Sequence, residues 1–132
     1  MIPFDSLDKG FCDSYQGCIV AYSQQAFDLL WNTNYSPAKG PQQPKVDFSK
    51  EMVLAAYTGA TTGLDYGIAI TDVKFAQDSL EVIVSPSMVD LKDVSSLNNR
   101  NAYHLVKVPR SEAEVIFLFG LKCVKPWASS RR

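Results

Sequence analysis

The sequence predicts a mainly-β domain of the α+β class, an antiparallel β-sandwich or small barrel with one short amphipathic helix near the N-terminus. Three observations predict this class. Short apolar stretches rich in Val, Ile and Tyr recur along the chain, turn residues separate them, and a single stretch has helical periodicity. The length of 132 residues fits one domain, so residues 1–132 are taken as a single unit.

The first predicted elements are a strand at residues 18–22 and a helix at about residues 24–33. The strand segment is short, apolar and aromatic at its end. Ser23 stands where an N-cap hydroxyl would accept a hydrogen bond from an early helical N–H. In the helix, apolar residues recur at i, i+3 and i+4, which places them on one face. We expect that face to dock on a sheet through Phe27 and Trp31.

A connector, a buried strand and a loop are predicted next. Residues 35–45 hold three prolines and one glycine, which is typical of an extended connector. Residues 52–57 form a nearly continuous apolar run, which suits a strand covered on both faces. Residues 58–65 are predicted to be a loop, because Gly59 and Gly63 tolerate positive φ.

Two hairpins are predicted in the second half of the chain. Residues 66–70 and 80–84 alternate in polarity on either side of a short polar turn, so they are expected to pair antiparallel. Residues 85–101 include Pro86 and a polar run and are predicted to be a long crossing loop. Residues 102–108 and 115–119 are then expected to form the second hairpin, across PRSEA.

Composition argues against two classes of function. Thirteen Lys and Arg stand against fourteen Asp and Glu, giving a net charge of −1, with no basic block that would track nucleic acid. No apolar run approaches the roughly 18–20 residues that a membrane-spanning helix needs. If Met1 is the native start, the lack of a basic and apolar leader predicts a cytoplasmic protein, whereas a chain trimmed of its leader would be exported or displayed at the cell surface.

The three cysteines are interpreted as reduced thiols that pack as small hydrophobic groups. A disulfide between Cys12 and Cys18 is the alternative for an exported chain. Convergence of Cys12, Cys18, Cys123 and His104 on zinc is disfavoured, because the four are scattered without the local spacing of zinc sites. No metal and no cofactor are predicted.

The residues needed for catalysis are not grouped in the sequence. His104 is the single histidine, and it shares strand parity with Val106 and Val108, so it is expected to point inward and to be packed and hydrogen-bonded. No GxSxG motif presents a serine nucleophile. The acidic residues of the central region fall in predicted loops, turns or polar faces, where solvated acids are usual: Asp65, Asp72, Asp78 and Glu81.

Aromatic side chains could mark an interface, since Tyr and Trp are enriched there. The candidates are Tyr35, Tyr57, Tyr66, Tyr103 and Trp127. For Tyr57, Tyr66 and Tyr103 we favour the alternative that they are core or boundary residues, because aromatics in alternating strands usually pack.

Several segments of the chain, in order, resemble the C-terminal domain of the PrcB family, named for a subunit of a bacterial cell-surface protease complex. They are Phe27-Asp-Leu-Leu-Trp31, Asp47-Phe-Ser-Lys-Glu-Met-Val53, a glycine-bearing loop before Tyr66, and Tyr103-His-Leu-Val-Lys-Val-Pro-Arg110. The similarity covers about residues 18–119. It implies a non-catalytic domain of bacterial, often exported proteins, some of which serve assembly of a protease complex. It also implies that Tyr103 and His104 are framework positions.

The sequence and the resemblance together predict a binding module that engages another protein, which the resemblance suggests could be a protease, through one loop. Its expected contact residues are Gly59, Thr61, Thr62, Gly63, Leu64, Asp65 and Tyr66. An alternative is a loop-inserting protease inhibitor, because Thr61-Thr62-Gly63 resembles part of the inhibitory loop of chagasin-type inhibitors. A further alternative is a small hydrolase or ligand-binding barrel, which would need His104 beside an acid and a nucleophile. Sheet edges and tyrosines also permit a homodimer.

Overall fold

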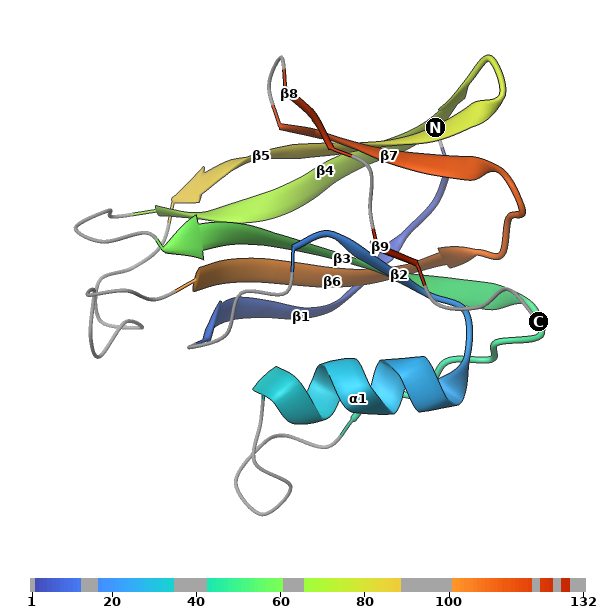
Figure 1. Cartoon of the computed structure of the whole chain (residues 1–132), viewed down its shortest axis with the longest axis horizontal. Helices are drawn as coiled ribbons and strands as arrows, with labels where there is room; N and C mark the ends of the chain where they lie inside the picture. Colours follow the sequence, from blue (N-terminus) through green and yellow to red (C-terminus); the bar gives the residue numbers. More distant parts are fainter. Residues whose placement is uncertain are drawn as a thin grey trace.

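The structure, a computed structural model, is a sandwich of two β-sheets with one helix on the outside (Figure 1). It describes residues 2–12, 17–34, 43–60, 66–88, 101–119, 122–124 and 127–128, and at several strand ends it describes the backbone alone. The sheets are open and do not close into a barrel, so the predicted sandwich is confirmed.

The first sheet has five strands and includes the N-terminal strand. Its order is β1 (Asp5–Cys12), β6 (Asn101–Pro109), β3 (Glu51–Ala60), β2 (Ile19–Ala21) and β9 (Trp127–Ala128). All neighbours pair antiparallel except β2 and β9, which run parallel.

The second sheet has four strands. Its order is β4 (Tyr66–Ala76), β5 (Ser79–Met88), β7 (Glu114–Phe119) and β8 (Lys122–Val124). β4 and β5 form the predicted antiparallel hairpin, with Gln77 in its turn at φ 58°. β5 and β7 run parallel, and β7 pairs antiparallel with β8.

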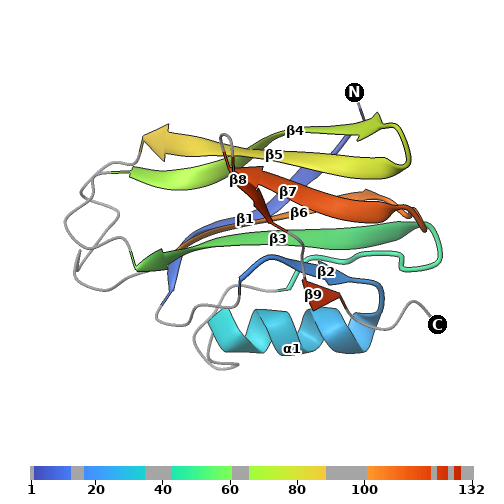
Figure 2. The same ribbon diagram turned by 45° about the horizontal axis from the view of Figure 1, so that its top comes forward.

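Helix α1 (Gln24–Asn34) confirms the predicted amphipathic helix and its cap. The hydroxyl of Ser23 accepts a hydrogen bond from the backbone N–H of Ala26 at 3.2 Å, and the Ser23 carbonyl accepts one from Phe27 at 3.0 Å. Phe27 and Trp31 are buried, as expected for the docking face. The helix lies along the outer face of the five-stranded sheet (Figure 2). No helix among the described residues is long and apolar enough to cross a membrane.

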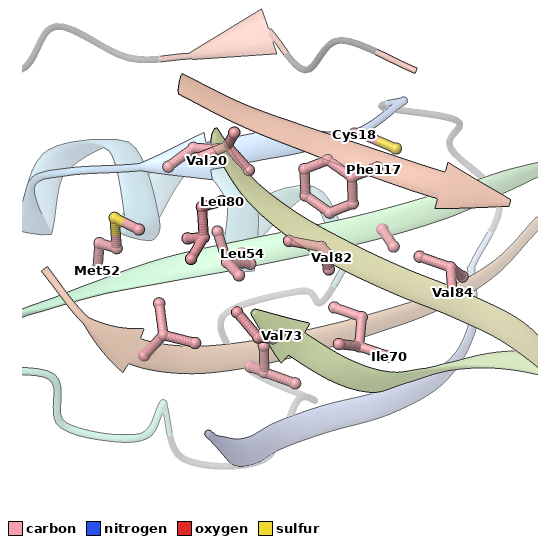
Figure 3. Close-up of a cluster of buried hydrophobic side chains, with 14 of the residues drawn as sticks. Cys18, Val20, Met52, Leu54, Ile70, Val73, Leu80, Val82, Val84 and Phe117 are labelled. Atoms are coloured by element: carbon pink, nitrogen blue, oxygen red, sulfur yellow. The ribbon is translucent and has the colours of Figure 1, made fainter. Parts of the chain in front are cut away.

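Two hydrophobic clusters hold these layers together. The larger one fills the space between the sheets, where Leu54 and Val20 of one sheet face Leu80, Val82 and Phe117 of the other (Figure 3). The smaller one lies between the five-stranded sheet and α1 and includes the side chains of Phe27, Trp31, Val53, Ala55, Tyr57, Tyr103 and Leu105.

The five-stranded sheet is therefore the middle layer, and its strand β3 is buried on both faces. In β3, Met52, Leu54 and Ala56 point into the larger cluster, while Val53, Ala55 and Tyr57 point toward the helix. Because both faces are covered, the strand needs apolar residues at every position. This explains the continuous apolar run at residues 52–57 and confirms the prediction made from it.

The predicted second hairpin is wrong. β6 pairs with β1 and β3 in the five-stranded sheet, whereas β7 pairs with β5 and β8 in the other sheet. The segment 110–113 crosses from one sheet to the other instead of turning back. Pro109 ends the ladder because it has no N–H to donate, and the next N–H, that of Arg110, donates to the carbonyl of Lys50 at 2.8 Å.

Strand β1 was not predicted, because its residues are mostly poor strand formers with little apolar alternation. It forms because β6 offers a ladder to pair with, and as the edge strand of its sheet it can keep polar side chains at the surface. Its pairing shifts register between Ser6 and Asp8, which marks a β-bulge.

The loops predicted at residues 58–65 and 85–101 begin later than expected. β3 continues to Ala60, with a register shift after Tyr57 that accommodates Gly59 as part of a bulge. β5 continues to Met88 and includes Pro86. Proline is tolerated there because the pairing of β5 with β7 ends at Val84, so at Pro86 the strand has a neighbour on one side only.

Candidate functional site

One end of the sandwich gathers the ends of strands from both sheets. In the five-stranded sheet, Cys12 and Ala60 both pair with Asn101, the first residue of β6. In the other sheet, Tyr66 pairs with Met88. Figures 1 and 2 place these ends on the same side of the molecule. We call this side the loop end, defined by Cys12, Ala60, Tyr66, Met88 and Asn101.

Of the predicted contact residues, the structure describes Gly59 and Tyr66. Gly59 lies within β3 and not in a loop, and Tyr66 is the first residue of β4. Thr61, Thr62, Gly63, Leu64 and Asp65 lie outside the described residues. Residues 61–65 join β3 of one sheet to β4 of the other, so both of their anchoring strands belong to the loop end.

His104 connects the two sheets close to the loop end. Its Nδ1 accepts a hydrogen bond from the backbone N–H of Ile70 in β4 at 2.8 Å. Its Nε2 lies 2.8 Å from the hydroxyl of Ser6 in β1. Since Nδ1 is an acceptor, the neutral ring carries its proton on Nε2 and donates to Ser6. His104 is 5% exposed and both of its ring nitrogens have hydrogen-bond partners, so the prediction of an inward, packed and hydrogen-bonded histidine is confirmed.

The surroundings of His104 disfavour its charged form. Burial, and after it the positive charge of Lys9, lower the pKa of His104 to about 4, against the raising effect of the Asp8 carboxylate. The imidazole is consequently neutral at pH 7. Its proton stays on the nitrogen that faces the serine.

This arrangement is the reverse of the one that activates a serine. A general-base histidine accepts the serine proton on one nitrogen and donates the other N–H to a carboxylate. Here the nitrogen facing Ser6 carries the proton, and the other accepts from Ile70. The Asp8 carboxylate accepts a hydrogen bond from the hydroxyl of Tyr103 at 2.7 Å. Of the described residues, no carboxylate hydrogen-bonds the ring, so the pairing that a hydrolase would need is incomplete.

Ser6 was missed in the sequence analysis. The segment around it is polar and has no strand signal, and its partner is 98 residues away in the chain. The pair exists because β1 and β6 are neighbours in the sheet. No local pattern at residues 5–12 could have indicated it.

Two of the candidate interface aromatics are core residues. Tyr57 and Tyr103 are 1% and 2% exposed, and their rings meet edge to face at a centroid distance of 5.7 Å beneath the helix. The core interpretation is confirmed for both. The side chains of Tyr35, Tyr66 and Trp127 lie outside the described residues.

Cys18 is a free and buried thiol, which confirms its interpretation as a packed reduced cysteine. Burial raises the pKa of the Cys18 thiol to about 11, against the lowering effect of a hydrogen bond with the Tyr57 backbone. A thiol that stays protonated at pH 7 is a poor nucleophile. The side chains of Cys12 and Cys123 lie outside the described residues.

Two of the segments that carry the family resemblance meet at Arg110. Its Nη1 donates to the backbone carbonyl of Tyr22 at 2.9 Å and to that of Phe48 at 3.0 Å. Its guanidinium lies 5.3 Å from the centre of the Tyr22 ring. Together with the bond from its backbone N–H to Lys50, these contacts join three separate parts of the chain. We call this group the arginine clamp.

The turn that the arginine clamp holds is shaped by Asp47. The Asp47 carbonyl accepts from the N–H groups of Lys50 and Glu51, and its carboxylate accepts from the Ser49 hydroxyl at 2.6 Å. Glu51 in turn lies 3.5 Å from the ammonium of Lys107 in β6. All of these contacts are made within the chain. The segments around Asp47 and Arg110 therefore serve as framework, at the end of β6 away from the loop end.

Replacing Arg110 with alanine is expected to lower the free energy of unfolding by about 2 kcal/mol, since two carbonyls lose a charged donor and the cation–π contact is lost. Arg110→Lys is the matched control. It keeps the positive charge but lacks the guanidinium geometry, so it should lose about half as much. Urea unfolding of the native chain and the two variants measures these changes in the free energy of unfolding. A change below about 0.5 kcal/mol in Arg110→Ala would contradict the role of the clamp.

No grouping of three or more His, Cys, Asp or Glu side chains able to hold a metal ion occurs within the described part of the chain. The chain matches no model of a known protein family, no curated protein and no solved structure.

Proposed function

We propose that this chain is a non-catalytic module that binds another protein through its loop end, as a PrcB-like accessory domain of a protease complex would. The observation that carries the proposal is the convergence of strand ends from both sheets at the loop end. Loops that such a scaffold presents side by side can form one contact surface. The proposed contact residues are Gly59, Thr61, Thr62, Gly63, Leu64, Asp65 and Tyr66.

The two strands that flank residues 61–65 are held firmly in the scaffold. β3, which leads into residues 61–65, is paired on both sides and buried on both faces. β4, which follows them, is paired with β5 and held by His104. Both strands are therefore fixed as far as the residues that flank the segment, Ala60 and Tyr66.

The non-catalytic part of the proposal is supported by the chemistry of the described residues. The serine–histidine pair has its proton on the wrong nitrogen for general-base catalysis. The buried thiol of Cys18 is protonated. The segments around Asp47 and Arg110 use their polar groups for internal contacts.

Site-specific photo-crosslinking in extracts of the source organism tests the binding surface. A photoreactive amino acid is placed at Thr62 or at Asp65 in separate proteins. The control position is Asp78, an exposed residue in the β4–β5 turn at the other end of the same hairpin. We expect one protein to be captured from both loop-end positions and not from Asp78, and mass spectrometry identifies it.

Two results would contradict the proposal. One is capture of the same proteins from Asp78 as from the loop end, and the other is no capture from the loop end. If the captured protein is a protease, its turnover with and without the intact chain separates assembly from inhibition. An assembly module leaves turnover unchanged, whereas an inhibitor of the chagasin type abolishes it.

A further inference from the structure

The outer edge of β4 is held by two hydrogen bonds from outside its own sheet. β4 is an edge strand whose partner in the sheet is β5. Toward the other sheet, the N–H of Ile70 donates to His104, and the carbonyl of Val73 accepts from the N–H of Ile2 at 2.7 Å. The register with β5 shifts between these two points, from Ile70 to Asp72. The β-bulge at this shift bends the strand where His104 contacts it.

One imidazole thereby joins three strands of two sheets. His104 belongs to β6, its Nε2 side contacts β1, and its Nδ1 side contacts β4. The contact with β4 depends on a lone pair of Nδ1. A second proton on the ring would occupy that lone pair and would point an N–H at the N–H of Ile70. The bond between the sheets would then be replaced by a repulsion.

The neighbouring charges offer little compensation for a charged ring. On β1, Lys9 disfavours the imidazolium, and Asp8 favours it but is hydrogen-bonded to Tyr103. β3 places Ala56 opposite His104 and so offers no titratable group there. On β4, the groups near the contact are the Ile70 N–H and, beyond the bulge, the Asp72 carboxylate. Asp72 is not among the charges that shift the pKa of the ring.

The contact lies near the loop end. Ile70 is four residues from Tyr66 in β4, and His104 is three residues from Asn101 in β6. At about 3.3 Å per strand residue, these are distances of roughly 10–13 Å along the strands. Release of β4 at Ile70 would therefore leave the end of the strand that receives residues 61–65 held by its pairing with β5.

We infer that His104 is a proton-sensitive latch, which holds the edge of β4 to β6 and β1 while the ring is neutral and releases it when the ring is protonated. The release loosens the two sheets at the loop end. The consequence for binding rests on the proposed function: the module would hold its partner at neutral pH and release it in acid.

Hydrogen exchange of backbone amides, followed by NMR in the intact chain, tests the latch without any partner. The opening constant of the Ile70 amide should rise roughly tenfold for each pH unit between about 6.5 and 4, because the opened state binds a proton that the closed state excludes. The reference is the amide of Val82 in β5, a strand paired on both sides within its sheet. Ile70 should exchange faster than Val82 throughout this range.

Two variants separate the latch from general packing. His104→Gln retains a neutral acceptor that does not titrate, so its Ile70 opening constant should be independent of pH. Ser6→Ala removes the partner of Nε2 but leaves Nδ1 in place, so the tenfold slope should remain. The ¹⁵N chemical shifts of the imidazole in the unmodified chain report the tautomer directly, even if a variant fails to fold.

Four outcomes would overturn the inference. They are a flat pH profile at Ile70 in the native chain, an opening constant of Ile70 no larger than that of Val82, a pH slope that persists in His104→Gln, and a proton on Nδ1 at pH 7. All four concern the isolated chain, so they leave the crosslinking test of the binding surface unaffected. Conversely, a failed crosslinking experiment would leave the latch itself intact.

Discussion

Replacing Phe27 with alanine is expected to lower the free energy of unfolding by about 3–5 kcal/mol. The side chain is fully buried between helix α1 and the five-stranded sheet. Its ring meets that of Trp31 edge to face at a centroid distance of 6.1 Å and lies 6.0 Å from that of Phe48. Alanine would leave a cavity at the centre of the smaller cluster. Urea unfolding followed by circular dichroism and tryptophan fluorescence measures the change.

Leu29 provides the matched control on the same helix. It is 66% exposed and lies outside both hydrophobic clusters, so Leu29→Ala should change the free energy of unfolding by no more than about 0.5 kcal/mol. Equal losses in the two variants would show that the helix is not anchored through the face assigned to it. The comparison matters for function because α1 covers the sheet that carries β3 and β6 to the loop end.

Acidification is expected to destabilise the whole chain through His104 by about 3 kcal/mol between pH 7 and pH 4. The folded chain holds the pKa of His104 at about 4, whereas the unfolded chain has the ordinary value of 6.5. Because the folded pKa is depressed, the contribution to stability is complete above pH 6.5. It declines as the pH falls through the interval between the two values, and little further change from this residue is expected below pH 4.

Urea unfolding at pH 7, 5.5 and 4 measures this dependence, with His104→Gln as the control. The difference between the two proteins isolates the histidine, because their carboxylates are shared. Hydrogen bonds from Ser49 hold the pKa of the Asp47 carboxyl below the ordinary 3.8, and its contribution, which starts to fall near pH 4, cancels because both proteins contain it. Parallel pH profiles for the native chain and the variant would contradict the assigned protonation state.

The elements predicted correctly have causes that lie within a few residues of sequence. Helix α1 follows from the spacing of its apolar residues and the hydroxyl of Ser23. The β4–β5 hairpin follows from alternation on both sides of a short polar turn. The burial of β3 on both faces follows from an apolar residue at every position from Met52 to Tyr57. In the helix and the hairpin the periodicity of the side chains determines which face is apolar, and in β3 its absence indicates that both faces are.

The wrong prediction was a hairpin between neighbouring segments, where the structure pairs each of them with distant ones. β6 and β7 are adjacent in sequence and each has the pattern of a strand, but they belong to different sheets. A strand pattern indicates that a segment pairs with other strands, but it does not indicate with which ones. The arginine clamp and the missing donor of Pro109 are found where the chain leaves the five-stranded sheet, and neither of them gives a periodic pattern in the sequence.

In the candidate site, too, the features that could be predicted have local causes, and the others depend on contacts between distant segments. The inward orientation of His104 follows from strand parity and was predicted from Val106 and Val108. Its partners, Ser6 and the N–H of Ile70, were not, because they come from strands 98 and 34 residues away. The chemistry of a histidine depends on which group each ring nitrogen contacts. The sequence therefore indicates a packed His104, whereas the structure shows that its ring connects the two sheets.

The sequence by itself determined that this protein is a β-rich domain with one capped helix, because side-chain period and turn chemistry act over short distances. The tertiary structure decided which strands became neighbours, and thereby which strand ends gather at the loop end and which nitrogen of His104 carries the proton. Those features arise from contacts between segments far apart in the chain. Their energies depend on the packed arrangement as a whole and on no single stretch of residues.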